Sequence, residues 1–295
     1  HSPVTISQNA VGQNPKIVTG GTVIVDPGVE VRFSSGAKLD VAGSIQLAGT
    51  AAAKVKLRGP GSMVVLKGGF ALELRLGDRA RSTRDVDVDW RLASADVAAL
   101  LRDAADLELD DYFEFSVERG ALGDDLDGGG ERWAVDAIVA GRLFERVAID
   151  VGFDEPVLMP DSVASSGLLA FAGVPPTTVR AIAVEQHLAE KLHAYTRIYS
   201  SGRTSSRVKD LVDVNVIADT MAIRAAELCD AVDATFARRG THPVPTVLPS
   251  PPADWAPAWR QLAADVPAPD DLDAGYRVAV ELFDPILDGA VTSGE

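Results

Sequence analysis

Cysteine is nearly absent from the sequence, which has 295 residues and a single cysteine, Cys229. One thiol cannot form an internal disulfide, and no Cys-x-x-Cys or Cys/His set accompanies it, so a disulfide scaffold is excluded and a structural zinc site is disfavoured. No apolar run reaches the roughly 18 to 20 residues that a membrane span needs, and no secretory leader is recognisable. We therefore expect a protein without a membrane anchor in a reducing compartment, the cytoplasm, with Cys229 in its core.

Positive charge is also scarce, since 28 lysines and arginines stand against 43 aspartates and glutamates, and the formal net charge is −15. This balance argues against a general nucleic-acid binder, because phosphate contacts require many cationic side chains. The cations are unevenly spread, however, and a local positive patch on an acidic protein can still receive phosphates. The clustered cations are Arg197, Arg203, Arg207, Lys209, Arg238 and Arg239.

Several common catalytic signatures are missing from the chain. It has no P-loop, no HExxH, no GxSxG and no Rossmann glycine pattern, so nothing supports an ATPase, a zinc protease, a serine hydrolase or a dinucleotide oxidoreductase. What is present is an ordinary globular composition, with 46% hydrophobic and 24% charged residues. The length allows two domains, or one large core with an appendage.

The first part of the chain, residues 1–62, differs from the rest in its pattern of apolar, polar and turn-forming residues. Short runs of alternating apolar and polar residues are separated by Pro-Gly, Ser-Gly and Ala-Gly turns, a pattern typical of consecutive short strands. The pattern is similar to the rungs of a parallel β-helix. The run "GPGSM" that ends at Met63 fits either a cloning junction or a natural Pro-Gly turn, so residues 1–62 are either a fused, non-native segment or a native β-rich one.

From Met63 the pattern predicts an α/β (α+β) fold in two parts. Residues 63–175 alternate apolar strands with helical periodicity, which indicates a domain with a mixed β-sheet. Residues 176–295 carry helical periodicity in four segments, which indicates a helical C-terminal domain. The predicted helices of that part are 184–199, 207–218, 222–239 and 274–287, with a proline-rich extended connector before the last.

The run "DVDVDW" places three carboxylates on alternate residues of a predicted strand. Asp85, Asp87 and Asp89 share one face, because side chains alternate along a strand. A solvated edge strand would explain this pattern without any function. The later strand "RVAIDVGF", however, places Asp150 in an apolar run, where a carboxylate must be paired or bind a cation. Asp85, Asp87 and Asp150 together would form an oxygen cage suited to Mg²⁺, with Asp89 outside it.

A second group of charged residues lies on the predicted helices. In "VEQHLAEKLHAYTR", Lys191 borders the apolar stripe of its helix, and in "SSRVKDLVDVNVIA", Asp210 shares a face with apolar residues. A lysine at such a border can simply lay its stem along the core. An inward lysine and an inward aspartate on adjacent helices will either form a buried ion pair or reach into a cleft that receives phosphates.

Three stretches of the chain, taken in this order, resemble the successive motifs of AbiEii-type nucleotidyltransferase toxins, members of the DNA-polymerase-β-like superfamily. They are "VLKGGFALELRLGDRARSTRDVDVDW", "HLAEKLHAYTR…SSRVKDLVDVNVIA" and "ATFARRGTHPVPTVLPSPPADW". The resemblance implies a minimal nucleotidyltransferase domain followed by a helical domain, with the nucleotide between them. It also implies a toxin with a separate antitoxin protein, which transfers a nucleotide, from a pyrimidine NTP in relatives, to tRNA with Mg²⁺ and so arrests growth.

The resemblance also implies roles for individual residues. Gly68, Gly69 and Thr83 would contact or position the nucleotide, and Arg207 would contact a phosphate. Asp85 and Asp87 would hold the metal, with Asp150 as the strand acid that activates the incoming hydroxyl. Lys191 would neutralise the triphosphate, and Asp210 would be an essential acid.

Other functions stay open at this stage. The same chemistry with a small-molecule or protein hydroxyl as acceptor would leave the same motifs, because acceptor choice depends on surface shape. A non-catalytic interaction protein is a third hypothesis, but it leaves the inward positions of Asp150, Lys191 and Asp210 unexplained.

Overall fold

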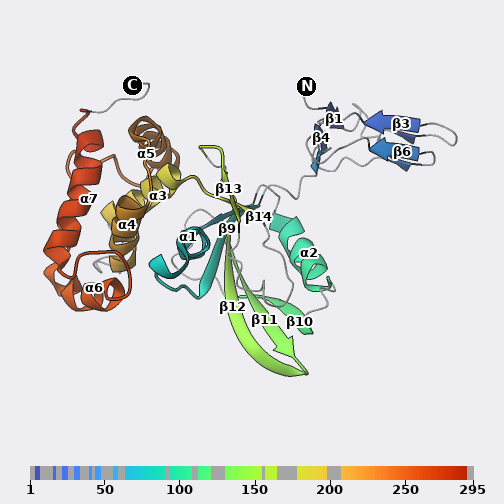
Figure 1. Cartoon of the computed structure of the whole chain (residues 1–295), viewed down its shortest axis with the longest axis horizontal. Helices are drawn as coiled ribbons and strands as arrows, with labels where there is room; N and C mark the ends of the chain where they lie inside the picture. Colours follow the sequence, from blue (N-terminus) through green and yellow to red (C-terminus); the bar gives the residue numbers. More distant parts are fainter. Residues whose placement is uncertain are drawn as a thin grey trace. The chain divides into compact units, whose positions relative to one another are not determined.

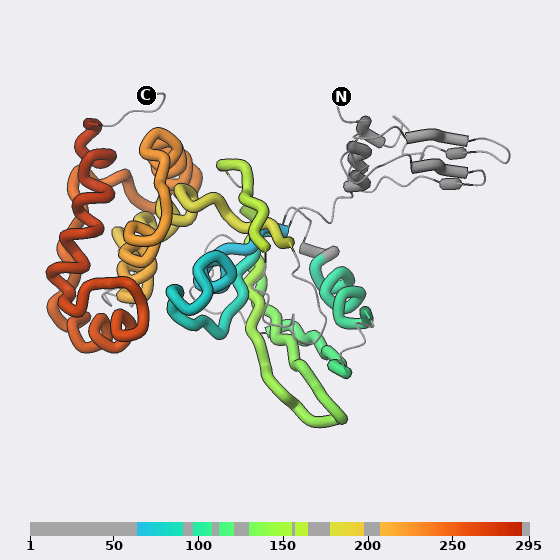
Figure 2. The backbone as a smooth tube through the Cα atoms, in the orientation of Figure 1, coloured from blue at the N-terminus to red at the C-terminus, as the bar shows by residue number. Residues whose placement is uncertain are grey.

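The fold was determined as a computed structural model, in which the chain divides into two compact units, residues 1–64 and 65–295. The structure describes residues 64–90, 94–107, 112–120, 130–154, 157–164, 178–197 and 207–290, together with the backbone of seven strands nearer the N-terminus. Both units are drawn in Figure 1, and Figure 2 traces the backbone by residue number.

The first unit is built from short parallel strands. Each strand pairs in parallel with the strand three places later in the chain: β1 with β4, β2 with β5, β3 with β6, and β4 with β7. Such pairing is the arrangement of successive rungs of a parallel β-helix, which confirms the β-rich interpretation of this segment. The strands are Val4–Ile6, Lys16–Ile17, Thr22–Val25, Glu30–Phe33, Asp40–Val41, Ser44–Leu47 and Lys56–Arg58.

The second unit contains a mixed sheet of seven strands in the order β10-β11-β12-β9-β8-β14-β13. Strand β9 lies inside this sheet, parallel to β12. The interpretation of "DVDVDW" as a solvated edge strand is therefore wrong. The strands are β8 Val64–Lys67, β9 Asp85–Trp90, β10 Phe113–Arg119, β11 Glu131–Val139, β12 Arg142–Gly152, β13 Asp161–Ala164 and β14 Thr178–Ala181.

Two helices belong to the sheet, and five follow it. Helix α1, Gly68–Leu76, follows β8 directly and contacts β9, and α2, Ser94–Ala105, contacts β10. The four predicted C-terminal helices are confirmed as α3 Val184–Thr196, α4 Val208–Thr220, α5 Ala225–Arg239 and α7 Leu272–Leu287. The prediction missed α6, Ala256–Ala263, together with β13 and β14. Helix α6 follows the proline-rich connector so closely that its periodicity covers only two turns.

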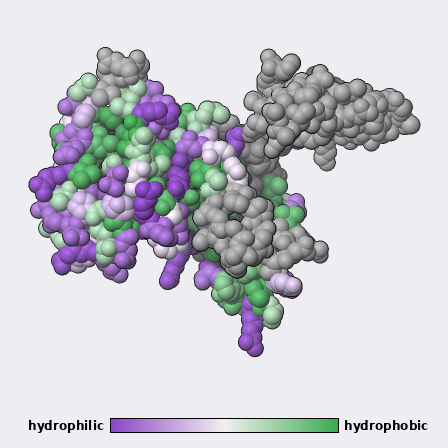
Figure 3. Space-filling view, viewed as in Figure 1, coloured by the Kyte–Doolittle hydropathy of each residue, from purple (hydrophilic) through white to green (hydrophobic). Residues whose placement is uncertain are grey.

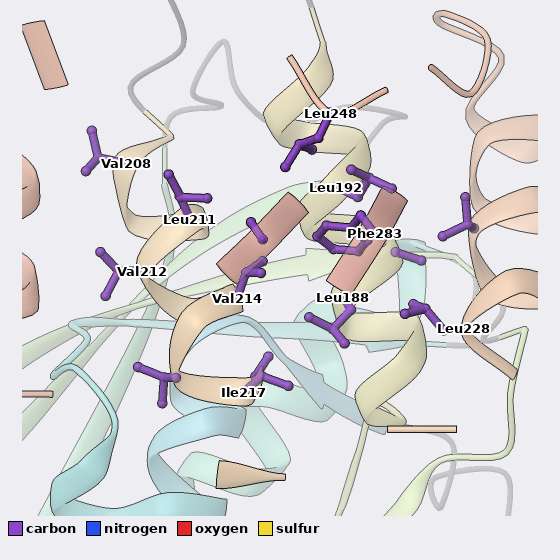
Figure 4. Packing of buried hydrophobic residues seen from close by; sticks show 14 of the residues in the cluster. Leu188, Leu192, Val208, Leu211, Val212, Val214, Ile217, Leu228, Leu248 and Phe283 are labelled. Atoms are coloured by element: carbon purple, nitrogen blue, oxygen red, sulfur yellow. The ribbon is translucent and has the colours of Figure 1, made fainter. Parts of the chain in front are cut away.

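The C-terminal helices enclose one hydrophobic core (Figure 4). Helix α4 runs through it and buries every residue from Asp210 to Ile217. Trp259 and Phe283 are the largest fully buried side chains. The indole of Trp259 lies against Gly275 of α7, where a Cβ would overlap the ring. Removing such a side chain would cost about 3–5 kcal/mol of unfolding free energy, so this core fixes α4 firmly. Cys229 is also buried, as predicted.

The junction between sheet and helices is short and hydrogen-bonded. Ile182, between β14 and α3, donates its backbone N–H to the Leu66 carbonyl of β8 at 2.8 Å and accepts from Arg75 Nη2 of α1 at 2.5 Å. Arg75 also pairs with Asp161 at 2.8 Å. These bonds place the first turn of α3 beside the β8–α1 junction. Residues from both halves of the unit are thereby brought to one place.

The surface is rich in hydrophilic side chains, as expected for a chain with 24% charged residues. Figure 3 shows hydrophilic side chains over much of the visible face of the C-terminal helices. In the part of the chain that the structure describes, no helix is both long and apolar enough to cross a membrane.

Candidate active site

A cavity of about 300 Å³ opens where the sheet meets the C-terminal helices. Its walls come from the β8–α1 junction, from β9 and β12, and from α3, α4 and the end of α5. Seven lysines and arginines and five aspartates and glutamates line it, so the cavity is locally cationic in a protein of net charge −15. The predicted site residues that line it are Gly68, Gly69, Asp87, Asp150, Lys191, Arg207 and Asp210.

The strand carboxylates lie on one face of the sheet, as alternation requires. Asp87 of β9 is the direct register partner of Asp150 on β12, so the two side chains are neighbours. Asp150 is 7% exposed and accepts two hydrogen bonds from Arg132, Nε to Oδ1 at 2.7 Å and Nη2 to Oδ2 at 2.6 Å. Among the described residues, no three His, Cys, Asp or Glu side chains are gathered closely enough to hold a metal ion.

Asp87 is the carboxylate that the fold leaves without a partner. It makes no hydrogen bond or ion pair with another residue of the described ranges. Burial raises its pKa, although Lys67 opposes the shift. The carboxylate lies against Gly68, which has φ +62 and where a Cβ would overlap the Asp87 oxygen. Gly68 is therefore needed twice, for its left-handed backbone and for the space it leaves.

Asp89 has a different partner. Its Oδ1 lies 2.7 Å from Lys67 Nζ, and Gly152 of β12 leaves room for it, since a Cβ there would overlap the same oxygen. Burial raises the pKa of Asp89 to about 6, against the attraction of Lys67. Both groups are therefore charged at neutral pH. Asp89 does not line the cavity.

The helix residues form a continuous charged network. Lys191 Nζ donates to Asp210 Oδ1 at 3.1 Å and to Asp213 Oδ2 at 2.7 Å. Arg81, from the loop before β9, donates twice to Asp213 at 2.9 Å. Arg207 approaches Asp210 at 3.5 Å. Of the two predicted alternatives for Lys191 and Asp210, both apply: they form a buried ion pair, and they also line the cavity.

The pKa shifts of this network follow from mutual attraction. Burial alone would lower the pKa of Lys191, but the carboxylates of Asp213 and Asp210 outweigh it and raise the pKa. Burial alone would raise the pKa of Asp210, but Lys191 and Arg207 lower it. Lys191 and Asp210 therefore stay ionised at neutral pH. Each charge has a partner, which is what burial in this position demands.

Thr83 and Asp85 lie outside the cavity lining. Thr83 packs behind Gly69, where a Cβ would come within 3.0 Å of its Cβ, and its backbone N–H points to Glu73 Oε2 at 3.4 Å. Asp85 is partly exposed near the start of β9, with Ala148 as its register partner. The structure thus separates the predicted site into residues that face the cavity and two that flank it.

Several residues that line the cavity, or that hold its lining residues in place, were not predicted from sequence. Asp213 could have been noticed, because it follows Asp210 by three residues on the same helix. Arg81 could not, since its partner is 132 residues away. Lys67 approaches Glu190 at 3.9 Å and Arg239 approaches the same carboxylate at 3.8 Å. His187 and His193 also line the cavity.

A family model described as the nucleotidyl transferase AbiEii toxin of type IV toxin–antitoxin systems matches residues 54–287. The chain belongs to the AbiEii family. It is therefore a nucleotidyltransferase of the toxin–antitoxin class, which implies a nucleotide substrate and an antitoxin partner. Members of this AbiEii family generally use a divalent metal ion.

Comparison with solved structures finds similarity to MenT4, a nucleotidyltransferase toxin from Mycobacterium tuberculosis H37Rv. The two share 21% sequence identity, over 79% of this chain and 86% of that one, with a TM-score of 0.47. No curated protein matches the chain.

Proposed function

We propose that this AbiEii protein transfers a nucleoside monophosphate from an NTP, a pyrimidine NTP in the first instance, to tRNA, with Mg²⁺ as its metal, and that it acts in the cytoplasm, where a cognate antitoxin restrains it. The observation that carries the proposal is the cationic cavity with the unpartnered carboxylate of Asp87 beside Gly68. A half-buried carboxylate without a partner is destabilised, and a ligand cation would offset that cost.

Carboxylate oxygens, which divalent metals prefer as ligands, stand on two neighbouring strands of the sheet. Asp87 and Asp150 are neighbouring oxygen donors, and Asp85 lies two residues away on the same face of β9. The three carboxylates together attract positive charge: the Arg132 guanidinium is hydrogen-bonded to Asp150, and Asp85 and Asp87 also raise its pKa. We assign Asp85, Asp87 and Asp150 as the metal ligands. When bound, the ion would polarise the phosphate oxygens and offset their charge.

The remaining residues bind and position the substrates. Lys191 and Arg207 offset the charge of the triphosphate, while Asp210 and Asp213 hold Lys191 in place. Gly68 and Gly69 allow the chain to approach the phosphates closely, and Thr83 supports the loop behind Gly69.

The proposed step is an in-line displacement at the α-phosphorus. The acceptor oxygen bonds to the α-phosphorus, the bond to the bridging oxygen breaks, and pyrophosphate leaves. The acceptor proton passes to the carboxylate of Asp150, which therefore acts as the base for the incoming hydroxyl.

The acceptor is inferred from charge. Arg197 and Arg239 line the cavity, and Arg238 is adjacent, so a polyanion can reach the site along them. Arg203, expected in the same surface, lies outside the described residues. A small-molecule or protein hydroxyl remains the second candidate acceptor, because the same cavity would serve it.

The test is incubation with Mg²⁺, each α-labelled NTP in turn and total tRNA. An Asp87→Asn variant is run beside it, with Glu145→Gln as the control, since Glu145 is an exposed acid on β12 away from the cavity. Label on tRNA with the parent and the control, and a loss of about 100-fold or more with Asp87→Asn, is the expected result. Label on the protein or on a small molecule in a lysate, with none on tRNA, would overturn the choice of acceptor. Absence of transfer to any acceptor would overturn the proposed function.

A further inference from the structure

His187 is a cavity residue whose hydrogen bonding is incomplete. It lies in the first half of α3, is 3% exposed and lines the cavity, yet its Nε2 is buried without a hydrogen-bond partner. The two other histidines of the described ranges are both bonded. His193 Nε2 pairs with Thr241 Oγ1 at 2.9 Å, and His242 bonds Thr241 and Thr196 at 2.9 and 2.8 Å. Of the two histidines that line the cavity, only His187 therefore has a buried Nε2 without a hydrogen-bond partner in the described part of the chain.

The surroundings of His187 indicate what would complete it. The charged groups that act on it most strongly are all cations: Lys191 one turn further along α3, Arg75 of α1, Lys67 of β8 and Arg81. Burial, and then these cations, lower the pKa of His187 well below its ordinary value, so the ring is neutral. A neutral ring beside several cations complements an anion, to which it can donate a hydrogen bond without adding charge.

All four cations are already paired with carboxylates, Lys191 with Asp213 at 2.7 Å. Arg75 bonds Asp161, Arg81 bonds Asp213 and Lys67 bonds Asp89, each within 3.0 Å. They hold their places through these carboxylates, so the cationic setting of His187 is built into the fold. An anion that entered would meet fixed charges instead of mobile ones, which reduces the reorganisation needed on binding.

We propose that His187 binds the nucleotide by donating Nε2–H to a phosphate oxygen of its triphosphate, and so forms a phosphate-binding position in addition to Lys191 and Arg207. The proposal rests on the function proposed above. It extends that function by assigning the end of the cavity near α1, Lys67 and Arg81 to phosphate, and it makes His187 a residue that touches substrate.

The experiment compares His187→Leu, which removes the donor, with His187→Gln, whose side-chain N–H₂ can replace Nε2–H. His242→Gln is the control, because His242 is a histidine outside the cavity lining. Binding of inorganic pyrophosphate, CTP and UTP is measured by titration calorimetry with Mg²⁺ present. We expect His187→Leu to weaken pyrophosphate binding about tenfold, and His187→Gln to stay within about threefold of the parent.

Thermal unfolding without ligand is a second measurement, and it distinguishes a histidine that binds ligand from one that only supports the fold. Because the unpartnered Nε2 destabilises the empty protein, His187→Leu should leave Tm unchanged or raise it, while reducing the increase in Tm that pyrophosphate causes. A histidine that only supports the core would instead lower Tm in both conditions. His187→Phe repeats the test if the leucine variant does not fold.

The outcomes separate this proposal from the function on which it rests. Equal pyrophosphate binding by the parent and His187→Leu, with nucleotidyl transfer intact in the parent, overturns the role of His187 alone. Equal loss in the Leu and Gln variants, both folded, overturns it too, because the donor would not be what matters. If the parent neither binds pyrophosphate nor transfers a nucleotide, both the proposed function and the proposed role of His187 are overturned.

Discussion

Asp210 of α4 and Asp87 of β9 line the same cavity and have opposite surroundings. On the helix, Asp210 and Asp213 are held by Lys191, Arg81 and Arg207. On the strand, Asp87 has no such partner within the described part of the chain. The helix acids are thus part of the framework that positions a lysine. The carboxylate of Asp87 is instead free to bind a ligand from outside the chain.

The largest effect is expected from breaking the helix network. Lys191→Met leaves Asp210 and Asp213 buried without their shared cation, which should cost about 3–5 kcal/mol of unfolding free energy. Urea unfolding of the purified variant measures this loss. A double variant, Lys191→Met with Asp210→Asn, should recover part of it, and recovery of none would show that the unbalanced carboxylate of Asp210 is not the cause of the loss.

A smaller loss is expected at the glycine that makes room for Asp87. Gly68→Ala places a Cβ into the carboxylate and forces alanine into a left-handed backbone, at a cost of about 1–3 kcal/mol. Nucleotidyl transfer should fall as well, because Asp87 must move. The control is Gly289→Ala, which also has a positive φ but has open space around it. Equal effects at both positions would mean that only backbone strain matters.

The acids of the two regions should respond to pH with opposite signs. The pKa of Asp89 is raised from 3.8 to about 6, so its folded form binds the extra proton, and the parent should gain stability relative to Asp89→Asn as pH falls from about 6 to 4. The pKa of Asp210 is lowered from 3.8, so the parent should lose stability relative to Asp210→Asn as pH falls below that value. Unfolding free energies at a series of pH values measure both slopes, and slopes of one sign would contradict the contrast.

The smallest effect is expected from removing the unpartnered acid. Asp87→Asn deletes a half-buried charge that has no hydrogen-bond or ion-pair partner in the described part of the chain, so the unfolding free energy should stay within about 1 kcal/mol of the parent, or rise. Thermal unfolding without metal gives the comparison. A large destabilisation would show that Asp87 is structural, like the acids of α4.

Much of the fold could be predicted from local pattern. The bounds of β9 agree with the predicted strand, and the four long C-terminal helices were found from periodicity to within a few residues. Strands β13 and β14 were missed because they are short, and α6 because prolines precede it. The family match, residues 54–287, includes all the predicted site residues.

The sequence by itself determined which acids share a face of β9, that Lys191 and Asp210 lie at the inner side of their helices, and that a β-rich segment precedes the α/β part. These features follow from side-chain alternation and helical periodicity, which act over a few residues. Only the tertiary structure decided how each charge is paired. Arg132 with Asp150 and Arg81 with Asp213 join residues 18 and 132 positions apart, and these two buried acids are paired because the packing brings a distant cation to each.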